Sequence, residues 1–342
     1  MLMRSGKGVL SKAVVGLMLV AASAGTAMAQ SGKPIEFRVA SEAPPGQLVS
    51  ISIDRWVEAV NKESGGRFKG ASFPAGQLFK DRDALQVIGQ KGTLEFAVPN
   101  LAIVSSVVPS LNALNLPFLL SPDTPQRFQQ AVGLESPLGK RYQSEARARG
   151  IEVVLVRPVG SIILISKSPI NTLADLQRKK IRHWGGGAYA ESAITRMGGS
   201  PVFVPAPEVA SGLQQGVIDA AFGTVQFWAA ALGDVAKYAI WSDGIAGVGQ
   251  TLIANKEFWD GLSAADRKML NDSAKKWLVD WLAEQIDAGV KEDLKKLEAK
   301  GAKISKLSDA ELAKAKQLTA PVWDMANDAL GKGFIDELRK GR

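Results

Sequence analysis

One pattern of residues occurs twice in this chain, and each copy has the order strand end, Pro-Ala turn, helix, glycine, next strand. The first copy starts at Phe73-Pro74-Ala75 and ends within 91–97, and the second starts at Val204-Pro205-Ala206 and ends within 215–221. Strand–helix–strand units build α/β sheets. Because ligands bind at the carboxyl ends of such strands and at domain interfaces, the repeat predicts two similar α/β lobes with a cleft between them.

The rest of the chain agrees with two lobes. Its 342 residues are many for one core and enough for two, and 46% of them are hydrophobic, which indicates a globular chain. Strand and helix patterns alternate from Ile35, reach a boundary at 157–160, and start again with strands at 162–165 and 180–182. This alternation predicts mostly parallel sheets.

The C-terminal part has a helical pattern. Apolar residues recur every three or four positions from Leu270 to Leu297, a stretch of roughly 28 residues or ~42 Å of helix. A helix of this length can lie across both lobes, although Gly289 could bend it. Ser263 with Asp266, and Ser308 with Glu311, resemble capping boxes at helix starts.

The N-terminus has the features of a cleaved secretory signal. Three basic residues precede an apolar run at 13–22, and Ala27-Met28-Ala29 matches a cleavage site that leaves Gln30 first. The alternative is a membrane anchor, but the run is shorter than the ~20 residues that a span requires. We therefore expect an exported, periplasmic protein with residues 1–29 removed.

Charge and cysteine content exclude several classes of site. Outside 1–29 the chain has 39 basic and 34 acidic residues, and late lysines alternate with acids, as on a solvated helix face rather than a nucleic-acid surface. The absence of cysteine excludes disulfides, thiolate metal sites and cysteine nucleophiles. We expect no cofactor, no metal cluster and no nucleic-acid partner.

A search for catalytic motifs finds little. The chain has a single histidine, His183, and lacks the G-x-S-x-G, phosphate-loop and H-E-x-x-H patterns. The glycine run 185–187 before a helix reads either as an anion cradle or as a flexible turn. Arg182, at the end of the strand 180–182, reads either as a surface arginine or as a fork for a ligand carboxylate.

At this point the residues match a family. The chain resembles the periplasmic solute-binding proteins of TRAP transporters (tripartite ATP-independent periplasmic transporters) of the dicarboxylate- and sialic-acid-binding type. The resemblance covers nearly the whole mature chain. Its motifs lie at 73–78 (FPAGQL), 166–170 (SKSPI), 175–176 (DL), 180–182 (KIR), 198–201 (GGSP), 208–209 (EV) and 213–219 (LQQGVID).

The resemblance implies a two-lobe periplasmic binding protein fold of the type II-like kind, with hinge strands and a long lobe-spanning helix, that closes on its ligand. We assign 30–159 with about 247–285 to lobe I, and 160–246 with about 286–342 to lobe II. Arg182 occupies the position of the family's carboxylate-binding arginine. The implied partners are a small and a large TRAP membrane subunit, and the implied activity is binding, without catalysis.

Departures from the sialic-acid type suggest the ligand. Where those members have a second arginine this chain has Ile162, and Phe222 and Val98 also stand at polar or charged positions of that type. Polar ligand groups left without partners there would cost about 1–3 kcal/mol each. We therefore expect a monocarboxylate with an apolar or aromatic body, bound by Arg182. The other candidate contacts are Trp184, Phe222, Trp228, Gly185, Asn100, Gln47 and Ile162.

Two other functions remain open from the residues. The same clamp could present its ligand to a receptor kinase as a sensor. An exported hydrolase or lyase could use Arg182 and His183 with Glu208 or Asp219. Glu208, however, opens a helix, where a carboxylate complements the helix dipole.

Overall fold

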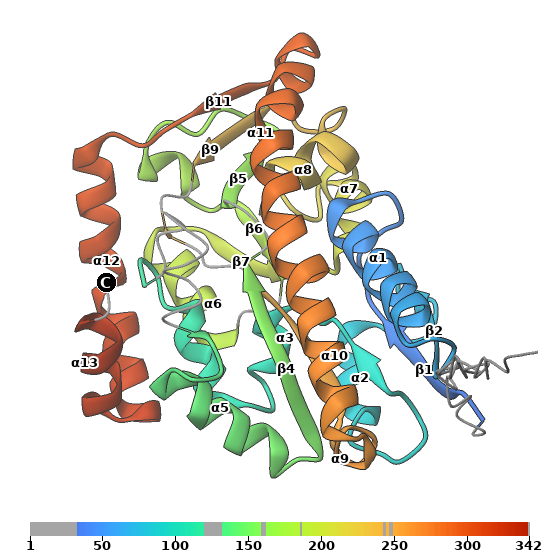
Figure 1. Ribbon diagram of the computed structural model, residues 1–342. Coiled ribbons are helices and arrows are strands. Elements are labelled where there is room, and N and C mark those ends of the chain that lie inside the picture. Colours follow the sequence, from blue (N-terminus) through green and yellow to red (C-terminus); the bar gives the residue numbers. More distant parts are fainter. Residues whose placement is uncertain are drawn as a thin grey trace, which may run out of the picture. The chain divides into compact units, whose positions relative to one another are not determined.

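The computed structural model describes residues 33–119, 132–158, 162–184, 187–241, 244–245 and 249–340. The predicted signal peptide and Gly185 lie outside these residues. The body that begins at Pro34 forms one compact unit. It contains two β-sheets with helices packed against them (Figure 1).

The first sheet has five strands in the order β2-β1-β3-β10-β4. β1 is parallel to β2 and β3, with Ile35 opposite Phe68, while β10 is antiparallel to both β3 and β4. The strands are β1 (Ile35–Ala40), β2 (Phe68–Phe73), β3 (Phe96–Ala97), β4 (Ile151–Pro158) and β10 (Gly249–Asn255).

The second sheet has six strands in the order β11-β9-β5-β8-β6-β7. β6 is parallel to β7 and β8, and β5 is antiparallel to β8 and β9. The strands are β5 (Ile162–Ser166), β6 (Lys180–His183), β7 (Ser200–Phe203), β8 (Ala220–Thr224), β9 (Tyr238–Trp241) and β11 (Lys303–Ser305).

The duplicated pattern produces the same arrangement in both sheets. The first copy forms β2, α2 (Asp81–Val87) and β3, and the second forms β7, α7 (Val209–Gln215) and β8. In each sheet the two strands of the copy flank a third, parallel strand, giving β2-β1-β3 and β7-β6-β8. The prediction of parallel strands is correct for these triplets. It is wrong for β5 and β10, which are antiparallel to both of their neighbours. The chain enters each of these strands directly from the other sheet, without the crossover helix that joins parallel strands of one sheet.

The remaining helices cover the sheets. The first sheet buries an aromatic cluster in which Phe96 packs edge-on to Trp56 of α1, with ring centroids 5.3 Å apart. The remaining helices are α1 (Leu48–Glu63), α3 (Leu101–Val104), η1 (Pro109–Asn115), α5 (Pro137–Arg147), η2 (Leu173–Leu176), α6 (Gly187–Arg196), η3 (Ala206–Glu208), α8 (Val225–Phe227), η4 (Trp228–Leu232), α9 (Lys256–Gly261), α12 (Asp309–Leu330) and α13 (Lys332–Lys340).

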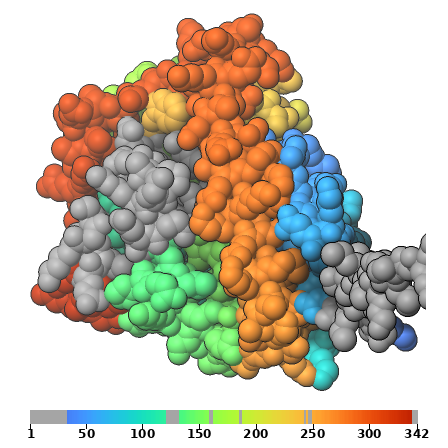
Figure 2. Space-filling view, viewed as in Figure 1, coloured from blue at the N-terminus to red at the C-terminus, as the bar shows by residue number. Residues whose placement is uncertain are grey.

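The predicted long helix forms as one continuous stretch. α10 (Ala264–Ala274) leads through a π-helical turn, η5 (Lys275–Asp280), into α11 (Trp281–Ala299), and Gly289 does not interrupt it. Ser263 and Asp266 make the expected capping box. α11 contacts α1, which covers the first sheet, and α8, which follows β8 of the second (Figure 1). Figure 2 shows the orange surface of α10 and α11 as a ridge beside the blue α1.

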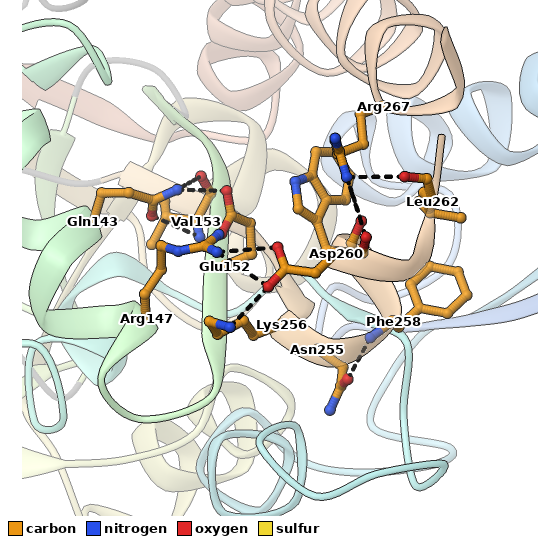
Figure 3. Close-up of polar contacts among 11 residues, drawn as sticks. Gln143, Arg147, Glu152, Val153, Asn255, Lys256, Phe258, Asp260, Leu262 and Arg267 are labelled. Atoms are coloured by element: carbon orange, nitrogen blue, oxygen red, sulfur yellow. Dashed lines mark hydrogen bonds and ion pairs between the residues drawn. The ribbon is translucent and has the colours of Figure 1, made fainter. Parts of the chain in front are cut away.

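A polar network secures the segment that follows β10 (Figure 3). Asp260 of α9 accepts hydrogen bonds from Lys256 Nζ at 2.7 Å and from Arg147 of α5 at 3.0 Å. Arg147 also pairs with Glu152 of β4, whose carboxylate accepts a 2.7 Å bond from Gln143. These contacts hold α9, which follows the strand that returns to the first sheet, against β4 and α5.

The boundaries of the two lobes stay a proposal. β10 and β11 lie in the sheets to which the proposal assigns them. Trp323 of α12, however, packs in the same hydrophobic cluster as Tyr142 of α5, a helix assigned to the other lobe.

Candidate functional site

A cavity of about 140 Å³ lies where the carboxyl ends of parallel strands from both sheets meet. The first sheet contributes the segment after β1, the start of α2, the segment after β3, and β10. The second contributes β5 and the ends of β6, β7 and β8. The lining is Glu42, Ala43, Pro44, Gln47, Val49, Asp81, Asn100, Ile103, Ile162, Arg182, Trp184, Phe203, Pro205, Ala206, Gly223, Thr224, Phe227 and Gln250.

Arg182 is the cation of the cavity. Its side chain is buried, and two backbone carbonyls hold it: Nε donates to Val204 at 2.8 Å and one terminal nitrogen to Phe222 at 3.0 Å. Within the described residues the other terminal nitrogen donates to no protein group. Burial lowers the pKa of Arg182 to about 10, against the opposing effect of Glu42, so the guanidinium stays charged at neutral pH. The arrangement presents a fixed, charged donor to an anion.

Two carboxyl groups, Glu42 and Asp81, also line the cavity. Glu42 Oε1 accepts the backbone N–H of Asp81 at 3.0 Å, and Asp81 Oδ2 accepts the backbone N–H of Asn100 at 2.8 Å. Burial, and then the nearby charge of Glu42, raise the pKa of Asp81 to about 8. Asp81 is therefore largely protonated at neutral pH.

The apolar part of the lining is aromatic and aliphatic. The Trp184 ring lies 5.9 Å from the guanidinium carbon of Arg182, and Ile162, Phe203 and Phe227 complete the apolar walls. The cavity thus combines one positive group, an acidic corner, neutral polar side chains such as Asn100 and Gln250, and apolar walls.

The structure brings most of the predicted site residues together. Arg182, Trp184, Asn100, Gln47 and Ile162 all line the cavity. Their contact with a ligand stays a prediction, as does that of Gly185, which lies outside the described residues.

Two predicted aromatic contacts lie elsewhere. Phe222 packs edge-on to Trp184 at 6.1 Å and reaches the site only through its carbonyl. Trp228 is buried in the second-sheet core, where its Nε1 donates to the Ala236 carbonyl at 2.8 Å. Val98 is also fully buried, in the first-sheet core. Neither Phe222 nor Trp228 lines the cavity, because strand alternation and helix packing turn both side chains into the core.

Sequence reasoning missed Glu42, Asp81 and Gln250. Glu42 stands two residues after the end of the first strand, and the strand-end rule that selected Arg182 would have selected it too. Asp81 reads as an ordinary first-turn acid of α2. Gln250 carries no local signal, since it opens a strand whose neighbours lie far away in the sequence.

His183, next to Arg182, points away from this cavity. Its Nε2 lies 3.5 Å from Glu191, and its ring packs edge-on to Phe203. Burial, followed by the charges of Arg182 and Arg82, lowers the pKa of His183 to about 4. His183 is not part of the lining of this cavity.

A larger hollow, about 870 Å³, runs along α11 beside Gln226 and Gly46. Its lining mixes small residues with polar side chains and with exposed charges such as Lys296 and Glu292. Exposed charged groups such as these are less suited to orienting a small ligand than the buried Arg182 of the first cavity. In the part of the chain that the structure describes, no group of three or more metal-ligating side chains occurs, and no helix has the length and apolarity to cross a membrane.

The fold and this site define a binding protein, and comparison with known proteins identifies its family. Residues 39–328 match the model for "Bacterial extracellular solute-binding protein, family 7". The chain belongs to this family, whose members are solute-binding proteins and not enzymes.

Individual relatives are distant but span most of the chain. The ectoine/5-hydroxyectoine-binding periplasmic protein UehA of Ruegeria pomeroyi is 26% identical over 89% of this chain and 87% of its own length. The C4-dicarboxylate-binding periplasmic protein DctP of Shewanella loihica is 24% identical over 95% of each. A TRAP periplasmic solute-binding protein from Chromohalobacter salexigens with bound D-glucuronate superposes with a TM-score of 0.80 at 21% identity, covering 90% of this chain and all of that one.

Proposed function

We propose that this chain is the periplasmic solute-binding subunit of a TRAP transporter, and that it captures a small monocarboxylate with an apolar or aromatic body through Arg182. It then delivers the ligand to the small and large membrane subunits. A signal peptide directs its export and is cleaved after residue 29. The observation that carries the proposal is the position of Arg182, a buried arginine held by two carbonyls with a terminal nitrogen left for an anion.

The charges around the cavity support a ligand with one carboxylate. Glu42 has no ion-pair partner among the described residues, and it lies close enough to raise the pKa of Arg182. A second carboxylate on the ligand would face this group at short range, where like charges repel strongly in a partly buried site. Ile162, Trp184, Phe203 and Phe227 offer apolar surface for the remainder of the ligand.

Binding of this kind acts on a transporter through the closed form of the protein. The cavity takes side chains from both sheets, so a ligand that contacts both stabilises an arrangement in which they are close together. The ligand must favour that arrangement differentially, since equal affinity for open and closed forms shifts nothing.

Thermal melting of the mature chain against a panel of organic acids tests the proposal. The panel comprises aromatic and branched aliphatic monocarboxylates, their sulfonate analogues and dicarboxylates. We expect monocarboxylates with apolar bodies to raise the melting temperature in a dose-dependent way, by an amount that corresponds to about 2.7 kcal/mol at 100 times the Kd. A shift with dicarboxylates alone would contradict the ligand class, and no shift with any acid would contradict the role of Arg182.

A further inference from the structure

A second buried arginine, Arg157 at the end of β4, lies behind the cavity. Its side chain is fully buried, with 0% of its surface exposed. One terminal nitrogen donates to Ser52 Oγ of α1 at 2.8 Å and to the Leu278 carbonyl of the π-helical turn η5 at 3.0 Å. The other donates to Gln250 Oε1 at 2.8 Å.

No carboxylate accompanies this charge. All three acceptors are neutral, and Nε has no partner within the described residues. Burial lowers the pKa of Arg157 to about 9. A buried charge without a counter-ion is costly, and apolar residues often replace buried charged groups without loss of stability. Fold stability alone is thus a weak explanation for an arginine at this position.

The contact with Gln250 leads from Arg157 to the ligand cavity. Arg157 and Gln250 are directly opposed across the antiparallel β4–β10 pair, so their side chains share one face of the sheet. The Gln250 backbone is bridged on its other side to Asn100, which also lines the cavity. The Gln250 backbone is therefore held by β4 on one side and by Asn100 on the other, which fixes the direction of its side chain.

The chemistry of the pair fixes the orientation of the carboxamide. An arginine has only donors, so the Gln250 group facing it must be the oxygen, as the 2.8 Å contact has it. The amide nitrogen is then turned away from Arg157. It donates to no group in the described part of the chain, while Gln250 lines the cavity. Without Arg157 the carboxamide could rotate and present either its oxygen or its nitrogen.

We propose that Arg157 is a positioning residue that holds the Gln250 carboxamide with its N–H groups toward the cavity, creating a donor subsite for an acceptor oxygen of the ligand in addition to the carboxylate bound by Arg182. This inference rests on the proposed function and narrows its ligand class. The ligand is a monocarboxylate that also carries an oxo, hydroxyl or ether oxygen. A plain hydrocarbon acid leaves the Gln250 N–H groups without a partner when the cavity is closed.

Calorimetry with matched acids tests the subsite. The probes are two pairs that differ by one oxygen: 4-methyl-2-oxopentanoate with 4-methylpentanoate, and phenylpyruvate with 3-phenylpropanoate. For the unmodified mature chain we expect the oxo acid of at least one pair to bind about tenfold more tightly than its parent, the effect of one added hydrogen bond. Gln250→Leu should abolish this ratio.

Variants of Arg157 separate positioning from a structural role. Arg157→Met should reduce the oxo-to-parent ratio as Gln250→Leu does, and Arg157→Met in the Gln250→Leu background should reduce it no further. Arg157→Lys, which keeps a donor, should restore part of the ratio and serves as the second variant if the Met protein folds poorly. Arg149→Met removes an exposed guanidinium and is the matched control.

The outcomes that overturn the inference are distinct from those that overturn the proposed function. Equal binding of oxo and parent acids, or an Arg157→Met protein that loses affinity for both equally, overturns the Gln250 subsite while leaving the Arg182 site intact. Binding of parent acids that survives Arg182→Ala overturns the proposed function instead. Failure of all four acids to bind overturns both.

Discussion

Two buried arginines, one from each sheet, are associated with one cavity, and they differ in which guanidinium N–H groups remain free to donate. Arg182, from the second sheet, donates to two carbonyls and keeps a terminal nitrogen for the cavity. Arg157, from the first sheet, donates with both terminal nitrogens to Ser52, Leu278 and Gln250. Among the described residues, neither has a carboxylate within hydrogen-bond distance.

The difference teaches that burial and missing ion pairs do not by themselves mark a ligand-binding arginine. Both side chains are at most 5% exposed, and burial lowers the pKa of both. The distinguishing feature is the donor that remains unused. By this criterion we propose that Arg182 binds the ligand directly and that Arg157 acts only through Gln250.

The largest expected effect is on Arg182. Arg182→Ala removes the only guanidinium that lines the described cavity, so affinity for a monocarboxylate that raises the melting temperature should fall at least 100-fold, since hydrogen bonds to charged groups are worth about 1.5–3 kcal/mol each. Arg182→Lys keeps a charge but loses the planar fork and should recover only part of the affinity. Calorimetry measures both, with exposed Arg196→Ala as the control. An Ala variant of unchanged affinity would show that the anion binds elsewhere.

Substitution of Arg157 should change the stability of the ligand-free protein only slightly. Arg157→Met removes an unpaired buried charge while leaving three acceptors without a donor, and these terms offset each other. We expect the melting temperature of the ligand-free protein to stay within about 4 °C of the parent, roughly 1–2 kcal/mol for a protein of this size. Scanning calorimetry checks this. A fall of 10 °C or more would mean that Arg157 primarily holds α1 and η5 to the sheet.

The acidic corner near Arg182 predicts a dependence of stability on pH. Asp81 keeps a proton up to about pH 8 in the folded protein, whereas its ordinary pKa is 3.8. The unfolded chain releases this proton earlier, so the contribution of Asp81 to stability is lost as pH rises from about 4 to 8. Asp81→Asn removes that loss.

The measurement is the melting temperature of both proteins between pH 5 and 8. The variant should gain on the parent by about 3 °C or more as pH rises, which corresponds to roughly 1 kcal/mol. Glu42 and Arg182 remain in both proteins, so the two proteins differ only in the side chain at position 81. A difference that stays constant with pH would contradict the raised pKa of Asp81.

The smallest expected effect concerns an exposed arginine. Arg55 of α1 stacks over Trp281 of α11 at 4.6 Å and over Trp277 of η5 at 5.5 Å. It thereby joins α1 to the continuous helix formed by α10, η5 and α11. Arg55→Ala should cost about 0.5–1 kcal/mol of unfolding free energy, the usual value of an exposed cation–π contact. Urea denaturation resolves this cost, and ligand affinity should not change. An affinity loss would instead connect this contact to closure.

The sequence predicted the duplicated unit, most strand and helix positions, and five residues of the cavity lining. These succeeded because strand ends, capping boxes and apolar periodicity are local signals, as at Ser263 and around Arg182. Arg157 shows where such reasoning stops. It stands at the end of an apolar strand, and the residues that bury and bond it, Ser52, Gln250 and Leu278, lie about a hundred positions away in both directions. Only the assembled sheet brings them together.

The strand order of the first sheet has a consequence for how the chain acquires its structure. β10 lies between β3 and β4, yet it is made after nine other strands, including β5 to β9 of the second sheet. A nascent or partly translocated chain that ends before Gly249 therefore has β4 without its sheet neighbour and Arg157 without Gln250. Such contacts between distant segments slow folding. The first sheet therefore cannot be completed before most of the second sheet has been synthesised, and the ligand cavity, which Gln250 of β10 helps to line, forms only after that late strand is in place.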